Sequence, residues 1–401
     1  MRRLVRFSVA IAAAVLTSAT GMTTAGAALT PDWAARAGTK LGSVASDPTG
    51  AAVVTGTIVV DGDPELFVRK YDEARNVLWT RSWGPRGTRV NGLDVTVDDR
   101  GDVYVVGEIA RANLEGGGYL LRKYSPKGRF LWGQVSAGGY VGGPDVPEVA
   151  TGVSVYGHHI IVVGHRYGCC GSAADDGWIR SFRPDGALRW TRDFEVPDVP
   201  RVTNDVAVEV ASDARGAYVV GSVETERRVD VSVRVDRELV VQKVSFSGER
   251  LWTYTLRDRH VRDEDRGTDV ALGGGVYVVG EVNGRGPSDG EGFAARLDRD
   301  GRLDWHETWG AASDGISPSG VAVASGDPIV TGSMADPSDR TVDVFIRLID
   351  ADGSLNERVV DDAPRSRVAS AIATGMTGVY VSGWLGGPGT PRDGRIWHWV
   401  L

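Results

Sequence analysis

Cysteine is almost absent from this chain, because Cys169 and Cys170 are the only two among 401 residues. This excludes a small domain held together by several disulfides. After the N-terminal segment the chain also lacks any run of about 18 apolar residues, the length that a membrane helix needs. Helical periodicity never extends beyond two turns, which excludes a mainly helical fold. We therefore expect no membrane insertion and a fold built from strands.

Positive charge is scarcer than negative charge. The chain has 45 Lys and Arg against 53 Asp and Glu, and its formal net charge is −8. Proteins that bind nucleic acids need Lys and Arg to neutralise phosphates and release their counterions. The composition therefore argues against a nucleic-acid partner.

The first 27 residues have the layout of a secretory signal peptide. Three arginines within the first six residues precede the apolar run Ser8–Leu16, and the small-residue site Ala25–Ala27 follows. The apolar run is too short to span a bilayer. We predict cleavage after Ala27 or Ala28, and we expect a secreted, extracellular product.

A unit made of a turn, a strand and a glycine recurs along the rest of the chain. In its clearest copy, Asp98–Gly107, a polar turn closed by Gly101 precedes the apolar strand Val103–Gly107. Near-copies recur every 51–59 residues, a period that indicates a repeat architecture. The glycines that end the seven copies are Gly56, Gly107, Gly164, Gly221, Gly280, Gly332 and Gly383.

Each repeat contains four short strands. In the second copy these are Leu93–Val97, Val103–Gly107, Tyr119–Tyr124 and Phe130–Gln134. Four strands repeated at this period are typical of a β-propeller blade, and middle strands are apolar throughout because neighbouring blades cover both faces. The glycine permits a close backbone approach that a Cβ would block. The sequence thus predicts an all-β fold, a single seven-bladed β-propeller over residues 28–401 with four antiparallel strands per blade.

The seventh repeat ends at Leu401 before any fourth strand. Near the other end of the chain, Pro31–Gly38 resembles Leu303–Gly310, which belongs to the fourth strand of the fifth repeat. We therefore predict that the N-terminal strand pairs with the C-terminal blade and closes the ring, which leaves no free edge between first and last blades. The alternative is that this segment forms a disordered leader.

The stretches VYVVGE and GYLLRKYSPKGRFLW in the second repeat, and FAARLDRDGRLDWHETWG in the fifth, carry a family resemblance. They resemble the bacterial β-propeller repeat of the SBBP type, and the segment RLDRDGRLD is similar to the delta-60 repeat of bacterial propellers. The resemblance implies the propeller fold. It implies little about activity, because such repeats occur in secreted and cell-surface proteins of mostly unassigned function.

The connections between strands differ in length. Those from first to second strand and from third to fourth are short turns, whereas the others are long and different in every blade, as His165–Asp176 and Ser222–Arg237 illustrate. Binding surfaces often form where irregular loops extend from a rigid scaffold. We predict the site on the face that carries the long connections, which we call the long-loop face. The alternative is that these loops are unconstrained surface.

Three aspartates, Asp94, Asp205 and Asp269, fall near the start of the innermost strand of three blades. Their carboxylates would line the mouth of the central channel, where oxygen ligands suit a cation such as calcium. Alternatively, each carboxylate accepts hydrogen bonds from nearby backbone. We predict all three as ligand-binding residues, with calcium as the one cofactor to consider.

The loop after His165 contains both cysteines. In a secreted protein Cys169 and Cys170 should be oxidised, and they would form either a vicinal disulfide or an intermolecular bridge. A vicinal bridge would clip the loop or shape a binding site, and a metal site with His165 is a further alternative. His165 is the fourth predicted ligand-binding residue.

A Gly-x-x-x-Trp spacing recurs in four of the repeats, as at Gly128 and Trp132. It resembles the tryptophan-docking motif of quinoprotein dehydrogenases, but the rest of that motif is missing, so we expect no quinone cofactor. We predict instead that each Trp packs the outer strand onto its own blade.

No nucleophile elbow, zinc-protease motif or phosphate-binding loop occurs in suitable context. We predict a secreted monomer that binds a protein, glycan or small ligand through its long-loop face. The alternative is a polysaccharide hydrolase or lyase with acidic residues on that face as catalysts.

Overall fold

A computed structural model describes residues 33–34, 40–111, 117–136, 147–167, 175–196, 204–229, 232–256, 264–283, 290–310, 315–336, 341–361, 366–376, 378–386 and 393–400. Within these ranges the regular elements are strands. No helix in them is long and apolar enough to cross a membrane.

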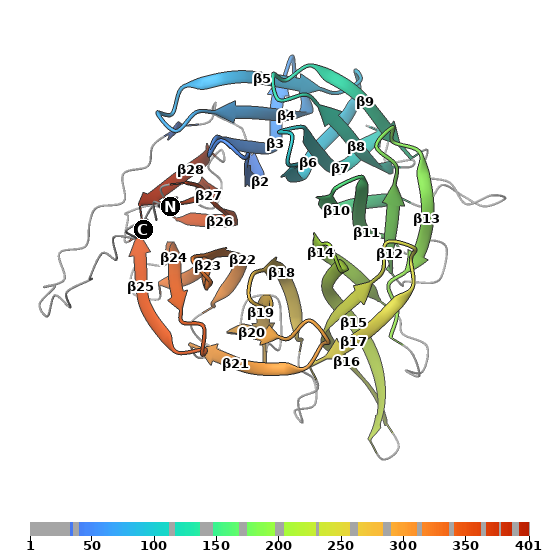
Figure 1. The fold of residues 1–401 in the computed structure, drawn as a ribbon, viewed down its shortest axis with the longest axis vertical. Helices are drawn as coiled ribbons and strands as arrows, with labels where there is room; N and C mark the ends of the chain where they lie inside the picture. The colour runs from blue at the N-terminus through green and yellow to red at the C-terminus, as the bar shows by residue number, and fades with distance from the viewer. Residues whose placement is uncertain are drawn as a thin grey trace, which may run out of the picture.

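The strands form seven four-stranded antiparallel sheets arranged around a common axis (Figure 1). This confirms the predicted all-β, seven-bladed propeller. From the innermost strand outward, the blades are β2 (Lys40–Ser46), β3 (Ala52–Val60), β4 (Asp63–Tyr71) and β5 (Val77–Trp83); β6 (Thr88–Val97), β7 (Val103–Arg111), β8 (Gly117–Tyr124) and β9 (Phe130–Val135); β10 (Glu148–Tyr156), β11 (His159–Arg166), β12 (Asp176–Phe182) and β13 (Leu188–Asp193); β14 (Asp205–Asp213), β15 (Gly216–Val229), β16 (Ser232–Val244) and β17 (Arg250–Thr255); β18 (Arg266–Leu272), β19 (Val276–Val282), β20 (Glu291–Leu297) and β21 (Leu303–Trp309); β22 (Ser317–Ala324), β23 (Asp327–Asp336), β24 (Thr341–Ile349) and β25 (Leu355–Asp361); and β26 (Arg367–Thr374), β27 (Gly378–Leu385), β28 (Asp393–Val400) and β1 (Trp33–Ala34).

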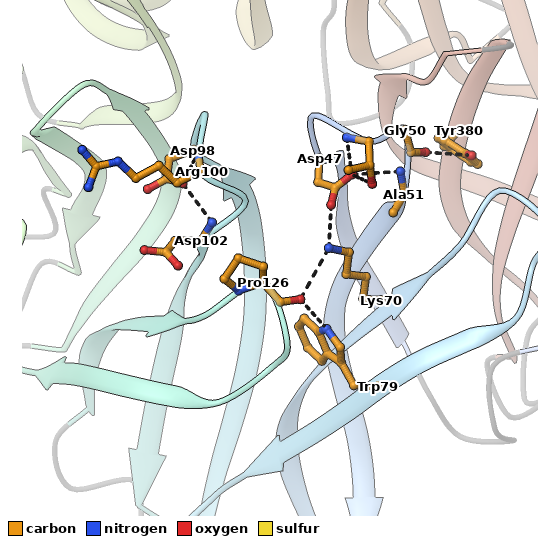
Figure 2. A network of polar contacts seen from close by, with 11 residues as sticks. Asp47, Gly50, Ala51, Lys70, Trp79, Asp98, Arg100, Asp102, Pro126 and Tyr380 are labelled. Carbon is orange, nitrogen blue, oxygen red and sulfur yellow. Dashed lines mark hydrogen bonds and ion pairs between the residues drawn. The ribbon is translucent and has the colours of Figure 1, made fainter.

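The ring closes between the two ends of the chain, as predicted. Strand β1 pairs with β28, with Trp33 opposite Ile396 and Ala34 opposite Arg395. A second link joins the seventh blade to the first, because the Tyr380 hydroxyl donates to the Gly50 carbonyl oxygen at 3.2 Å (Figure 2). The last blade is thus completed by residues from the opposite end of the chain.

The apolar core lies between neighbouring blades rather than within one of them. In β7, Val103 and Val105 pack into a cluster shared with the first blade, whereas Tyr104 and Val106 pack into a cluster shared with the third. Because side chains alternate between the two faces of a strand, a strand covered on both faces must be apolar at every position. This explains the continuous apolar runs in the sequence.

The repeat glycine lies inside each second strand, which continues beyond it, and it packs against the backbone of the innermost strand. A Cβ added to Gly107 would lie 1.9 Å from the Asn91 carbonyl oxygen, so no other residue fits without a shift. The other six glycines meet the equivalent carbonyl at 2.0–2.4 Å. The close approach coincides with a break in register in the inner strand, at Gly92 to Asp94 in the second blade.

The outer-strand tryptophans pack against the next blade, and not only onto their own blade as we predicted. The Trp79 Nε1 donates to the Pro126 carbonyl oxygen of the second blade at 3.0 Å (Figure 2). The Trp79 ring lies over Gly128, whose φ is 75°. Because the blades pack face to face, one face of each outer strand lies against the next blade, at the turn between that blade's third and fourth strands. The same contact joins Trp132 to Pro184, Trp190 to Phe246, Trp252 to Arg299 and Trp305 to Ala351.

Candidate functional site

A cavity of about 540 Å³ lies on the propeller axis and is lined by the innermost strands of all seven blades. Its lining includes the carboxyl groups of Asp94, Glu209 and Asp269 together with several Ser and Thr hydroxyls. None of the described lining residues is Lys, Arg or His. The lining extends from the middle of the inner strands toward the short turns, so the cavity is not confined to the long-loop face where we expected the site.

The three acidic residues occupy one equivalent position in their blades. Each directly follows the register break of its inner strand, as Asp94 follows Gly92 and Leu93 in β6. A β-bulge inserts an unpaired residue and re-aims the side chains beside it. In the third blade the corresponding residue is Gly152, and in the sixth it is Gly320.

Asp94 connects three blades. Its Oδ2 accepts a hydrogen bond from the Val153 N–H of the third blade at 2.8 Å, and it also accepts from the Ser43 hydroxyl of the first. The side chain is 7% exposed. Burial raises the pKa of the Asp94 carboxyl to about 6, although these hydrogen bonds favour the charged form.

Asp269 repeats this arrangement between the fifth and sixth blades. Its Oδ2 accepts from the Val321 N–H at 2.7 Å, and its Oδ1 accepts from the Val270 N–H at 2.7 Å. Burial is the main cause that raises its pKa to about 7, with a smaller contribution from the Asp94 charge. The two aspartates thus bind the residues that directly follow Gly152 and Gly320.

Glu209 was not among the predicted residues. Its Oε1 accepts from the Val210 N–H at 2.9 Å, and a Cβ on Gly152 would come within 2.6 Å of the same oxygen. The glycine therefore leaves the space in which this carboxyl lies, beside the segment that Asp94 binds. Burial, followed by the charges of Asp94 and Asp269, raises the pKa of Glu209 well above its usual value.

Asp205 lies apart from the cavity, at the start of β14 on the long-loop face. Its Oδ1 is buried and has no hydrogen-bond partner among the described residues. Burial, with the charges of Asp176, Glu195 and Glu224, raises its pKa to about 7. The structure therefore brings Asp94 and Asp269 together and leaves Asp205 outside that group.

His165 is also outside the cavity, near the end of β11 on the long-loop face. Its ring contacts Tyr167 with centroids 4.9 Å apart, and burial lowers its pKa. Cys169 and Cys170 lie outside the described residues, so the vicinal disulfide stays a prediction.

The described residues contain no group of three or more His, Cys, Asp or Glu side chains placed to hold a metal ion. Calcium binding by Asp94, Asp205 and Asp269 accordingly stays a prediction. The cavity as described offers carboxyl and hydroxyl oxygens to a ligand that donates hydrogen bonds or carries positive charge.

Comparison with known proteins gives the fold and not the activity. No protein-family model matches the sequence, and no curated protein sequence matches it. The resemblance to SBBP-type and delta-60 repeats therefore has no support from a family model. Secretion likewise stays a prediction, because the signal segment lies outside the described residues.

Several solved structures are similar in fold at low sequence identity. A puromycin hydrolase is 12% identical, with a TM-score of 0.51, over 89% of this chain and 51% of its own. The β-propeller domain of the Trilobed protease from Pyrococcus furiosus is 9% identical, with a TM-score of 0.47, over 90% of this chain and 94% of its own. A Trypanosoma rangeli sialidase is 9% identical, with a TM-score of 0.48, over 88% of this chain and 59% of its own.

This chain thus spans little more than half the length of the hydrolase and sialidase chains. At such identities the likeness shows a shared architecture alone. The class that fold and site define is a seven-bladed propeller with an acidic cavity on its axis.

Proposed function

We propose that the protein is an extracellular binding module that holds a small polar ligand in its axial cavity. The observation that carries the proposal is the convergence of Asp94, Glu209 and Asp269 on one cavity lined by all seven blades. Ligand sites are typically concavities of about 300–1,000 Å³ with a few convergent polar groups, and this cavity lies in that range.

The lining indicates the chemistry of the ligand. Carboxyl groups and hydroxyls accept hydrogen bonds, and the described lining carries no positive charge that would attract an anion. A glycan with several hydroxyls, or a small amine, fits this surface better than a carboxylate or phosphate. Asp205 and His165 remain candidate contacts at the long-loop face.

Binding can be tested by calorimetry on the chain from residue 28 onward, with panels of oligosaccharides, amines and organic acids. We expect a hit among the sugars or amines, and we expect Glu209→Gln to weaken it. The matched control is Asp99→Asn, an exposed carboxyl in the turn after β6. A hit confined to the acids, or equal binding by both variants, would contradict the proposal.

A second candidate function is that of a polysaccharide hydrolase or lyase. It is favoured by the raised pKa values of Asp94 and Asp269, because a carboxyl that stays protonated near neutral pH can act as a general acid beside an ionised partner. The test is release of reducing ends from the same oligosaccharides. Turnover abolished by Glu209→Gln or Asp269→Asn would favour the enzyme, whereas retention without turnover favours the binding module.

A further inference from the structure

A groove of about 480 Å³ lies between the third and fourth blades, away from the axis. Its floor consists of Ile179, Gln242 and Val244, each at most 2% exposed. Its walls come from the end of the outer strand β13 and from the turn that leads into β17. The repeats provide an internal comparison for this groove, because other pairs of blades meet in the same way.

Gln242 stands where four other blades have an arginine. It is paired with Val219, the second residue before the glycine of its second strand. The same register position holds Arg69 in the first blade, Arg122 in the second, Arg180 in the third and Arg347 in the sixth.

Arg69 lies over rings of its own blade, whereas the other three arginines each reach an aromatic ring of the preceding blade. The Arg122 guanidinium carbon lies 4.1 Å from the centre of the Trp83 ring in the first blade. Arg180 lies 4.8 Å from the Tyr119 ring in the second blade, and Arg347 lies 5.1 Å from the Trp309 ring in the fifth. An arginine side chain therefore fills the space between blades at these three interfaces.

The fourth blade departs from this pattern because glutamine is shorter. The Gln242 Nε2 donates to the Glu195 carbonyl oxygen at 2.6 Å and does not extend along the groove as an arginine does. The fifth blade has Ala295 at this position, but there Tyr254 and Leu256 of the preceding outer strand pack against the same core cluster.

In the outer strand β13 and just beyond it, the residues equivalent to Tyr254 and Leu256 are Arg192 and Phe194. Phe194 is fully buried in the core. Arg192 is exposed, and its Nε donates to the Gly248 carbonyl oxygen at 3.0 Å. Phe194 thus packs in the core beneath this interface, and it does not line the groove.

Three carboxyls and two guanidinium groups line the groove, which gives it a formal excess of one negative charge. Both arginines in its walls donate to backbone oxygens, Arg192 to Gly248 and Arg250 Nη1 to Glu195 at 2.9 Å. The wall carboxyls are those of Asp193, Glu195 and Glu249. Asp193 also pairs with Arg166 at 3.3 Å, but its side chain remains 68% exposed.

We propose that this groove binds an arginine side chain of a partner peptide or protein. The guanidinium of the partner takes the place that Arg122, Arg180 and Arg347 fill from within the chain at three other interfaces. A planar guanidinium forms paired hydrogen bonds with a carboxylate, which a lysine ammonium cannot reproduce.

The test compares two peptides, acetyl-Gly-Arg-Gly-amide and the same peptide with citrulline, by NMR titration of the chain from residue 28 onward. Citrulline keeps the shape of arginine and removes its charge. We expect the arginine peptide to bind at least about tenfold more tightly, because hydrogen bonds between ionised groups are the stronger ones.

The decisive variant is Gln242→Arg, which places at this position the arginine that other blades have there. We expect it to fill the groove and weaken the arginine peptide by about tenfold or more. The matched control is Arg122→Gln, which alters the first interface and leaves this groove intact, so the peptide should bind it as well as the wild type does. Glu249→Gln, in an exposed turn, provides a second variant if Gln242→Arg does not fold.

No binding of the arginine peptide, equal binding of the citrulline peptide, or undiminished binding by the folded Gln242→Arg or Glu249→Gln chain would each overturn the proposal. Because the groove lies off the axis, Glu209→Gln should leave the peptide affinity unchanged.

Discussion

The carboxylate of Asp94 in the second blade accepts a hydrogen bond from the backbone N–H of Val153 in the third blade, at 2.8 Å. In the same way, the carboxylate of Asp269 in the fifth blade accepts a hydrogen bond from the backbone N–H of Val321 in the sixth blade, at 2.7 Å. These carboxyls therefore both line the cavity and join neighbouring blades. A change at either residue should affect ligand binding and folding stability together.

Replacing Asp94 by Ala should destabilise the fold at pH 5.5 by about 1–3 kcal/mol, because the Val153 N–H loses its acceptor in a buried place. At pH 8 the loss should be smaller, since the variant also removes a charge that burial disfavours. Urea unfolding at the two pH values measures both. An equal loss for the exposed Asp99→Ala control would speak against a specific inter-blade bond.

The tryptophan contact between blades should be worth several kcal/mol. Trp79→Ala removes a ring that is 9% exposed and should cost about 3–5 kcal/mol. Trp79→Phe keeps most of the ring but loses the bond to Pro126, and should cost about 1 kcal/mol from that bond alone. Denaturant titration of both variants checks the order, and a loss as large for Phe as for Ala would contradict it.

The second-strand glycine should not tolerate a side chain. Gly107→Ala places a Cβ 1.9 Å from the Asn91 carbonyl oxygen, so strands β6 and β7 must shift apart. We expect a loss of about 2 kcal/mol or more, in the range of other overpacked positions. Gly274→Ala is the control, because its nearest atom would lie 3.6 Å away. Thermal melts that show no difference between the two would refute the close approach.

Ring closure depends on the strand at the start of the folded chain. Deleting residues 31–38 removes Trp33 and Ala34, which pair with β28, and should lower the melting temperature sharply. Deleting residues 1–27 alone should leave the melt unchanged. If both deletions melt alike, β1 does not complete the seventh blade.

The fold was predictable because one structural constraint, the glycine of the second strand, recurs every 51–59 residues. Gly107 and its six counterparts mark a contact that only glycine allows, so their spacing reveals the number of blades. The segment at Trp33 was recognisable because it resembles the outer strand at Trp305. The sequence of a single repeat does not show which residues of the next blade it contacts. The packing of Trp79 against the following blade was therefore not predicted.

The site was only partly predictable for a different reason. Asp94 and Asp269 were identified, but in the fourth blade Asp205 was chosen in place of Glu209. The bulge inserts a residue into each inner strand, so position along the strand does not show which side chain faces the axis. A small residue two places before the acid, as in Gly92, Ala207 and Gly267, was the signal that would have identified Glu209.

The shared cavity has a consequence for the pH dependence of stability. In the folded chain, burial raises the pKa of Asp94 to about 6 and that of Asp269 to about 7. In an unfolded chain the pKa of an Asp is about 4. The folded state therefore binds more protons between these values, and its stability should rise as the pH falls from 8 toward 5. Burial lowers the pKa of His165, which opposes this trend below about pH 6.5.

The most direct test of the account is the melting temperature of Glu209→Gln relative to the wild type at pH 8 and at pH 5.5. If three carboxyls share one cavity, removing the charge of Glu209 relieves the cost of burying that charge and its repulsion from Asp94 and Asp269, and the repulsion acts only where those groups are ionised. We predict that the variant melts at least about 2 °C above the wild type at pH 8, and that the difference shrinks at pH 5.5. The same difference at both pH values would contradict the convergence of these side chains on the axis.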